Sequence, residues 1–184
     1  MDDLKIIAES VPVEVQLASD GQYSYEYDKD EYTVTTSTND STFEIKITDN
    51  RPGVDSGDQS NVIVFIPNQS YNLITGVFEG SSLVLPAINS DITVTSNASS
   101  VAINLPSDYN KTLNYTRNAD SCSLSTNDIN DFAINAKISS STFSVPSSWP
   151  VYDMFSSNYD YTKGKGIAKI NIDVTSSSFA FNNE

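Results

Sequence analysis

A short phrase that recurs five times in the last two thirds of the chain constrains its fold more than any other feature. Apolar residues alternate with polar or small ones on both sides of a serine-rich step, as in Ile92-Thr-Val-Thr-Ser-Asn-Ala-Ser-Ser-Val-Ala-Ile103. The copies occupy residues 73–85, 92–103, 113–124, 132–143 and 170–181. Self-similarity at a spacing of about 20 residues is typical of β-solenoids, in which a repeat buries its apolar face only against a neighbour.

The spacing of the copies predicts how they stack. The first four start 19, 21 and 19 residues apart, and the fifth starts 38 residues after the fourth. Because 38 is twice 19, we expect a degenerate copy between them. Alternation places Ile92 and Val94, and Leu113 and Tyr115 one copy later, toward the core. Small residues at the step predict a tight corner, where large side chains would collide.

The N-terminal third has a different pattern. Alternating segments at residues 4–7, 11–17, 23–27, 32–36 and 42–48 are separated by turn-forming Gly, Asp and Asn. Residues 49–60 form a Gly-, Asp- and Ser-rich loop. We therefore predict an all-β fold with two parts. Residues 1–60 form a region of antiparallel-looking strands that either caps the repeats or forms the first of them. Residues 61–184 form a β-solenoid or β-helix-like region, packed as one continuous domain.

Composition restricts the partners. The chain has 184 residues, and 10 Lys and Arg against 24 Asp and Glu give a formal net charge of −14. Such a chain repels nucleic acid and anionic membranes. No stretch has the length and hydropathy of a membrane span, so we expect no direct membrane insertion. We expect a monomer.

Localisation is predicted from composition and from the first residues. The Ser-, Thr-, Asn- and Tyr-rich composition is typical of exported proteins, which predicts an extracellular or cell-envelope location. The chain starts without the basic and apolar segments of a signal peptide. We therefore expect any leader or anchor to lie outside this sequence.

The chain lacks the residues on which many catalytic and metal sites depend. It has no histidine and one cysteine, Cys122, which excludes Ser-His-Asp catalysis, the usual zinc sites and an intrachain disulfide. We expect a buried, inert thiol, no catalytic residues and no bound cofactor. Asp108 and Asp128 could pair as carboxylates at one edge, although turn formation explains both. Calcium is the one candidate metal, because residues 49–58 and 127–131 offer clustered oxygen ligands.

An aromatic segment at residues 146–166 interrupts the rhythm of the copies. Its aromatic side chains either pack into the core, which we favour, or form a binding patch. In the second case Trp149, Tyr152 and Tyr159 are the candidate ligand-binding residues. The expected ligand is a glycan or a surface protein.

Three features give the chain a family resemblance. They are the opening strand pair Leu4-Lys-Ile-Ile-Ala-Glu-Ser-Val-Pro-Val-Glu-Val15, the apolar strand Val62-Ile-Val-Phe-Ile-Pro67 and the repeated phrase. In these the chain resembles the DUF4097/DUF2807 group of adhesin-type bacterial β-repeat domains, the "head GIN" type. The resemblance implies an all-β, solenoid-like domain of an envelope protein and brings no catalytic residues.

The sequence therefore predicts a non-enzymatic, cell-surface adhesin-like or structural module, with binding spread along a ladder of side chains. Two alternatives stay open. One is a carbohydrate-binding or hydrolytic solenoid, and the other is an extracellular sensory or regulatory domain of a membrane-anchored protein.

Overall fold

The computed structural model describes residues 3–51, 60–126, 129–151, 153 and 157–182. These residues form seventeen strands in two mixed sheets and no helix, so none of them forms a helix that could span a membrane. The all-β prediction is confirmed. The strands are β1 (Asp3–Glu9), β2 (Pro12–Ala18), β3 (Ser24–Glu26), β4 (Tyr32–Asn39), β5 (Thr42–Asp49), β6 (Val62–Pro67), β7 (Leu73–Glu79), β8 (Ser82–Leu85), β9 (Asp91–Asn97), β10 (Ser100–Asn104), β11 (Thr112–Asn118), β12 (Ser121–Ser125), β13 (Phe132–Ser139), β14 (Thr142–Ser144), β15 (Asn158–Lys163), β16 (Ala168–Thr175) and β17 (Ser178–Asn182).

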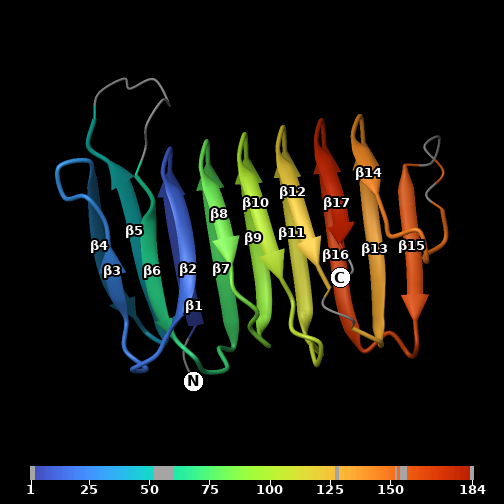
Figure 1. The fold of residues 1–184 in the computed structure, drawn as a ribbon, viewed down its shortest axis with the longest axis horizontal. Coiled ribbons are helices and arrows are strands. Elements are labelled where there is room, and N and C mark those ends of the chain that lie inside the picture. Colours follow the sequence, from blue (N-terminus) through green and yellow to red (C-terminus); the bar gives the residue numbers. More distant parts are fainter. Residues whose placement is uncertain (1–2, 52–59, 127–128, 152, 154–156, 183–184) are drawn as a thin grey trace.

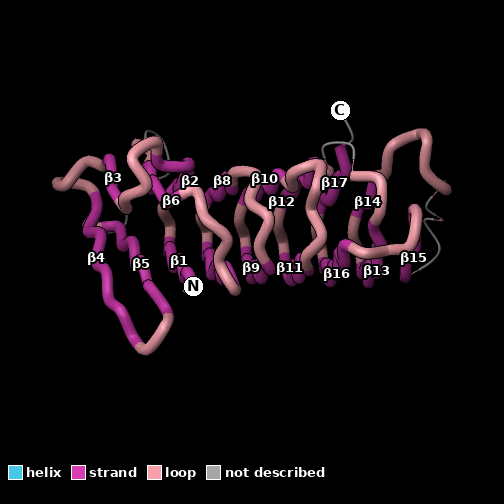
Figure 2. Tube along the Cα trace, turned by 90° about the horizontal axis from the view of Figure 1, so that it is seen from below, coloured by secondary structure: helices cyan, strands magenta, loops and turns pink. Residues whose placement is uncertain are grey.

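The two sheets lie face to face with the core between them (Figures 1 and 2). The nine-stranded sheet has the order β15-β13-β16-β11-β9-β7-β1-β5-β4, and the eight-stranded sheet has the order β14-β17-β12-β10-β8-β2-β6-β3. Each copy of the phrase contributes one strand to each sheet. We call such a pair of consecutive strands a layer.

The layers stack in parallel and in register. One apolar row crosses the nine-stranded sheet through Ile74, Ile92, Leu113, Ile170 and Ile134. Its counterpart in the eight-stranded sheet runs through Leu83, Val101, Cys122, Phe179 and Phe143. All ten side chains are buried, which confirms the inward positions that alternation predicts.

The pairing corrects the alignment of two copies. Leu73 pairs with Asp91 and Phe132 with Ala168, so the aligned positions are Ile74 and Ile134 rather than the first apolar residue of each phrase. The first copy was misaligned by one residue and the fourth by two. The true spacings are 18, 21, 21 and 36 residues.

The predicted degenerate copy between the fourth and fifth copies is wrong. The fifth copy, β16 and β17, lies between the third, β11 and β12, and the fourth, β13 and β14. Residues 145–167 contain β15, which pairs antiparallel with β13 at the sheet edge. The long connection lets the chain pass β13 and return to fill the gap next to β11.

The opposite end has the same kind of insertion. β1 and β2 lie between the layer of β5 and β6 and that of β7 and β8, and they pair in parallel with both. The predicted antiparallel pairing occurs only at the edge, where β4 pairs with β5 and β3 with β6. Figure 1 shows that the first and last described strands, β1 and β17, both lie inside the stack, with other strands between them and its ends.

A column of hydrogen bonds explains the serine-rich step between the two strands of a layer. The step begins with a left-handed residue, such as Ala98 with φ 51°. The side chain of the next residue accepts the backbone N–H of its equivalent in the adjacent layer. The donor–acceptor pairs are Val11 to Ser81 (3.2 Å), Ser81 to Ser99 (3.3 Å), Ser99 to Asp120 (2.6 Å), Asp120 to Ser177 (3.2 Å) and Ser177 to Ser141 (3.0 Å). Serine therefore supplies hydrogen bonds here as well as small size.

Candidate functional site

Polar side chains line up in register on the outer face of the nine-stranded sheet. The first line, the amide row, consists of Thr93, Asn114, Asn171, Asn135 and Asp160 on β9, β11, β16, β13 and β15. Asn171 Nδ2 donates to Asn114 Oδ1 at 2.9 Å, and Asn135 Nδ2 donates to Asp160 Oδ1 at 2.8 Å. Each of these hydrogen bonds fixes the orientation of an amide relative to a side chain on the neighbouring strand.

A second line, the charged row, runs beside the amide row, two residues later on β9, β11, β16 and β13 and two residues earlier on the antiparallel β15. It consists of Thr95, Thr116, Asp173, Lys137 and Asn158. All five side chains are exposed. Because alternate residues of a strand face the same side, both rows project from one surface.

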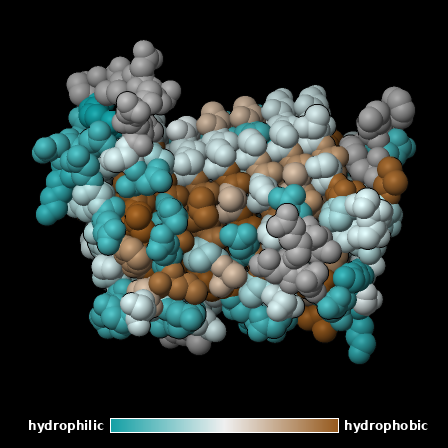
Figure 3. Space-filling view, in the orientation of Figure 1, coloured by the Kyte–Doolittle hydropathy of each residue, from teal (hydrophilic) through white to brown (hydrophobic). Residues whose placement is uncertain are grey.

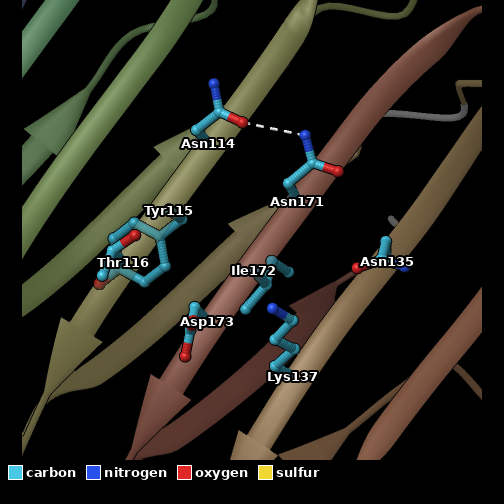
Figure 4. Close-up of a pocket in the computed structure, with 8 residues that line it drawn as sticks. All are labelled: Asn114, Tyr115, Thr116, Asn135, Lys137, Asn171, Ile172 and Asp173. Carbon is cyan, nitrogen blue, oxygen red and sulfur yellow. Dashed lines mark hydrogen bonds between the residues drawn. The ribbon is translucent and has the colours of Figure 1, made fainter.

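An open depression of about 220 Å³ lies between the two rows on β11, β16 and β13. Asn114, Asn171 and Asn135 border one side of it, while Thr116, Asp173 and Lys137 border the other (Figure 4). The six bordering side chains are polar and include one carboxylate and one ammonium group, while Tyr115 and Ile172 also line the depression. It can donate and accept hydrogen bonds at each strand step, about 4.8 Å apart.

The outer face of the eight-stranded sheet has fewer directional groups. Its central row runs through Val84, Ala102, Ser123 and Ala180. Figure 3 shows apolar side chains gathered over β6, β2 and β8 on this face, where Val84 is 40% exposed. The candidate site is therefore assigned to the nine-stranded sheet.

The aromatic residues singled out from the sequence lie at one end of the stack. Trp149 and Tyr159 are both buried, with 6% exposure. Trp149 contacts Phe132 with ring centroids 5.1 Å apart, and Tyr159 contacts Phe143 at 5.4 Å. The Tyr159 hydroxyl donates to the carbonyl of Pro150 at 3.0 Å. Tyr152 lies outside the described residues, and ligand binding by this group stays a prediction.

The predicted acidic sites are described only in part. Residues 52–59 and 127–128 lie outside the described residues, and this includes Asp128. Asp49 forms an ion pair with Arg51 at 2.8 Å, and hydrogen bonds from Arg51 lower the pKa of its carboxyl. In the described ranges no group of three or more His, Cys, Asp or Glu side chains is placed to hold a metal ion. Calcium binding stays a prediction.

A polar cluster is buried inside the core next to the serine column. Arg117 Nη2 donates to the carbonyls of Asp120 (2.9 Å) and Ser178, whereas its Nε and Nη1 have no hydrogen-bond partner. Asp120 accepts the hydroxyl of Ser96. Cys122 lies in the same region, as predicted for a buried thiol, and burial raises its pKa to about 12. This group is enclosed rather than open to a ligand.

Sequence reasoning missed the two polar rows because it concentrated on inward positions. The signal is nevertheless present, since asparagine follows the first aligned apolar residue in three copies, at Asn114, Asn135 and Asn171. Correct alignment of the fourth copy is needed to see it. The two-residue shift places Asn135 opposite Asn171.

Comparison with known proteins gives one structural likeness. No family model and no curated protein matches the chain, so the resemblance to the DUF4097/DUF2807 group has no family-model match to support it. The fold is similar to the crystal structure of a "putative cell adhesion protein" from Clostridium sporogenes, with a TM-score of 0.70 and 13% sequence identity. The match covers 100% of this chain and 92% of the other. At this identity, the likeness shows that the two proteins share a fold.

Proposed function

We propose that this chain is a non-enzymatic, adhesin-like β-repeat module of a bacterial cell envelope, of the DUF4097/DUF2807 type, that binds an extended neutral glycan. The glycan lies on the outer face of the nine-stranded sheet. The observation that carries the proposal is the pair of polar rows in register across five strands. A glycan running across the strands meets a hydrogen-bonding group at every step.

The energetics favour a long ligand over a short one. The polar groups of the rows are already solvated, so each new hydrogen bond contributes only about 0.5–1.5 kcal/mol net. Binding therefore requires many contacts along the rows, which a monosaccharide cannot supply. The net charge of −14 disfavours polyanionic glycans.

The structural neighbour supports the adhesin-like role and a cell-surface location. It is named a "putative cell adhesion protein", and the match with it covers 100% of this chain. The polar rows give that role a specific surface.

The test is calorimetric titration of the purified chain with neutral oligosaccharides of increasing length, with and without calcium. We expect affinity to rise with length and to fall about tenfold or more in Asn171→Ala, which removes the centre of the amide row. Ser100→Ala, on the outer face of the opposite sheet, is the control and should bind normally.

Three outcomes would count against the proposal. Absence of binding at every length would contradict it, as would equal binding by Asn171→Ala. Release of new reducing ends during the titration would instead favour the hydrolytic alternative.

A further inference from the structure

The β4 strand forms a free edge of the nine-stranded sheet. It is the terminal strand of that sheet and pairs only with β5 among the described residues. The side chains of residues 35–39 are exposed. Figure 2 shows the hairpin of β4 and β5 projecting from the body of the molecule. The edge is therefore accessible along most of its length.

The alternation of hydrogen-bonded and non-hydrogen-bonded pairs between β4 and β5 identifies which backbone groups of β4 face outward. The amide of Asn50 donates to the carbonyl of Glu31 at 2.8 Å, so these two residues form a hydrogen-bonded pair. In an antiparallel ladder such pairs occur at every second residue. The odd-numbered residues of β4 therefore bond to β5, and the N–H and C=O groups of Val34, Thr36 and Thr38 point away from the sheet.

β4 differs from the other edge strands in having no protection against pairing. Native proteins protect edges with short strands, charged side chains or proline. β3 and β14 have three residues each, and β15 carries Asp160 and Lys163. β4 has eight residues, Tyr-Thr-Val-Thr-Thr-Ser-Thr-Asn. None of them is charged and none is proline. The strand thus keeps a long, neutral edge rich in β-branched residues.

We propose that the β4 edge binds an extended segment of a partner protein, which adds to the nine-stranded sheet as a tenth strand. Main-chain hydrogen bonds to Val34, Thr36 and Thr38 would hold the segment, as in other cases of strand addition. This interaction is separate from glycan binding on the outer face.

The charges around β4 define the chemistry of the partner. Asp28, Lys29, Asp30 and Glu31 precede the strand, with Glu31 paired to Arg51 at 3.1 Å, and Asp40 follows it at the hairpin turn, so both ends keep a net negative charge. A segment with neutral β-branched residues in its centre and Lys or Arg at both ends fits these charges. An antiparallel second copy would bring its Asp40 toward Asp28 and Asp30, and the resulting repulsion disfavours self-pairing.

The experiment measures amide hydrogen exchange in the full chain by NMR. The probe is the synthetic peptide Lys-Lys-Thr-Val-Thr-Val-Thr-Lys-Lys, and the comparison peptide carries Glu in place of every Lys. We expect the Lys peptide to slow exchange at Thr36 and Thr38, and to bind about tenfold or more tightly than the Glu peptide.

Backbone hydrogen-bonding groups are removed first from β4 and then from the peptide, with one side-chain change as a control. Thr36→Pro deletes an outward N–H and is compatible with an edge position, so it should abolish binding while leaving the fold intact. Ser37→Ala changes only a side chain and should bind normally. A Lys peptide N-methylated at alternate residues removes donors from the ligand, and it should also fail to bind even if Thr36→Pro does not fold.

The proposal is overturned by any of three results. They are unchanged exchange at Thr36 and Thr38, equal binding of the N-methylated peptide, and a dimer in sedimentation experiments that Thr36→Pro dissociates. The last result would assign the edge to a second copy of the chain.

Discussion

Gly76 provides the space that the ring of Phe78 occupies on the inner face of β7. A Cβ atom at residue 76 would lie 2.5 Å from Cε2 of Phe78. The paired residues on β9 are Val94 and Ser96, so the next layer reverses the order of small and large side chains. In each of these two layers, one small and one larger side chain therefore fill the same space in the core.

We predict that Gly76→Val destabilises the protein by about 1–3 kcal/mol, because the ring of Phe78 must move in a closely packed core. The second change Phe78→Ser reproduces the Val and Ser pair of β9 and should recover part of the loss. Urea unfolding of the two variants measures both effects. An unchanged midpoint for Gly76→Val would contradict the prediction.

The buried thiol of Cys122 makes the folded state sensitive to alkali. Burial raises its pKa from an ordinary value of 9.0 to about 12, so in this interval the unfolded chain loses a proton that the folded chain keeps. Stability is therefore complete below about pH 9 and falls as the pH rises toward 12, by up to about 1.4 kcal/mol per pH unit. Unfolding measured across this range should show the decline.

The matched variant Cys122→Ala should lose less stability over the same interval. A smaller decline will persist, because burial also raises the pKa of Tyr115. An identical pH dependence in the two proteins would show that the thiol does not contribute.

At the scale of elements, the serine column is interrupted once by a charged residue. Asp120 occupies the place that Ser99 and Ser177 occupy in the adjacent layers. Arg117, which donates to the Asp120 carbonyl, keeps two guanidinium nitrogens without a hydrogen bond. The two charges are buried together at one level of the stack.

We predict that Asp120→Ser and Arg117→Leu each destabilise the protein, by about 1–3 kcal/mol, because each leaves buried hydrogen-bonding groups without a partner. The double variant restores a uniform serine column and an apolar core, and it should be close to the wild type in stability. A double-mutant cycle measured by chemical denaturation quantifies the coupling. Additive losses would mean that the two charges act independently.

Much of each layer can be predicted from the sequence, because alternation identifies both strands and their buried faces. The polar rows and the free edge of β4 could not be predicted in this way. The rows need the pairing of β13 with β16, which sequence order alone does not reveal. The edge of β4 depends on which strand ends the sheet, and that is decided by tertiary packing.

The order of the layers in the whole molecule could not be predicted for a different reason. The layers carry similar apolar rows, so many orders bury the same residues. The insertion of β16 and β17 between β11 and β13 depends instead on the long connection at residues 145–167, which allows the chain to return. Repeat spacing contains no information about this return.

We predict that a chain ending at residue 166 loses cooperative folding. The truncation removes β16 and β17, and β11 and β13 then lose the strand that joins them. A circular dichroism melt should show no sharp transition. As a control, replacing β15 with a Gly-Ser linker removes an edge strand together with the buried Tyr159, so this variant should be less stable but should still melt cooperatively. Retention of a sharp transition by the truncated chain would contradict the prediction.

The inserted last layer also determines when the protein can fold during synthesis. The ribosome makes the chain from its N-terminus, so β13 and β14 emerge before the strands that join them to β12 and β11. Domains generally fold as units once their parts are available. Completion of the stack therefore has to wait until β16 and β17 leave the ribosomal tunnel, and during that delay the nascent chain remains open to chaperones.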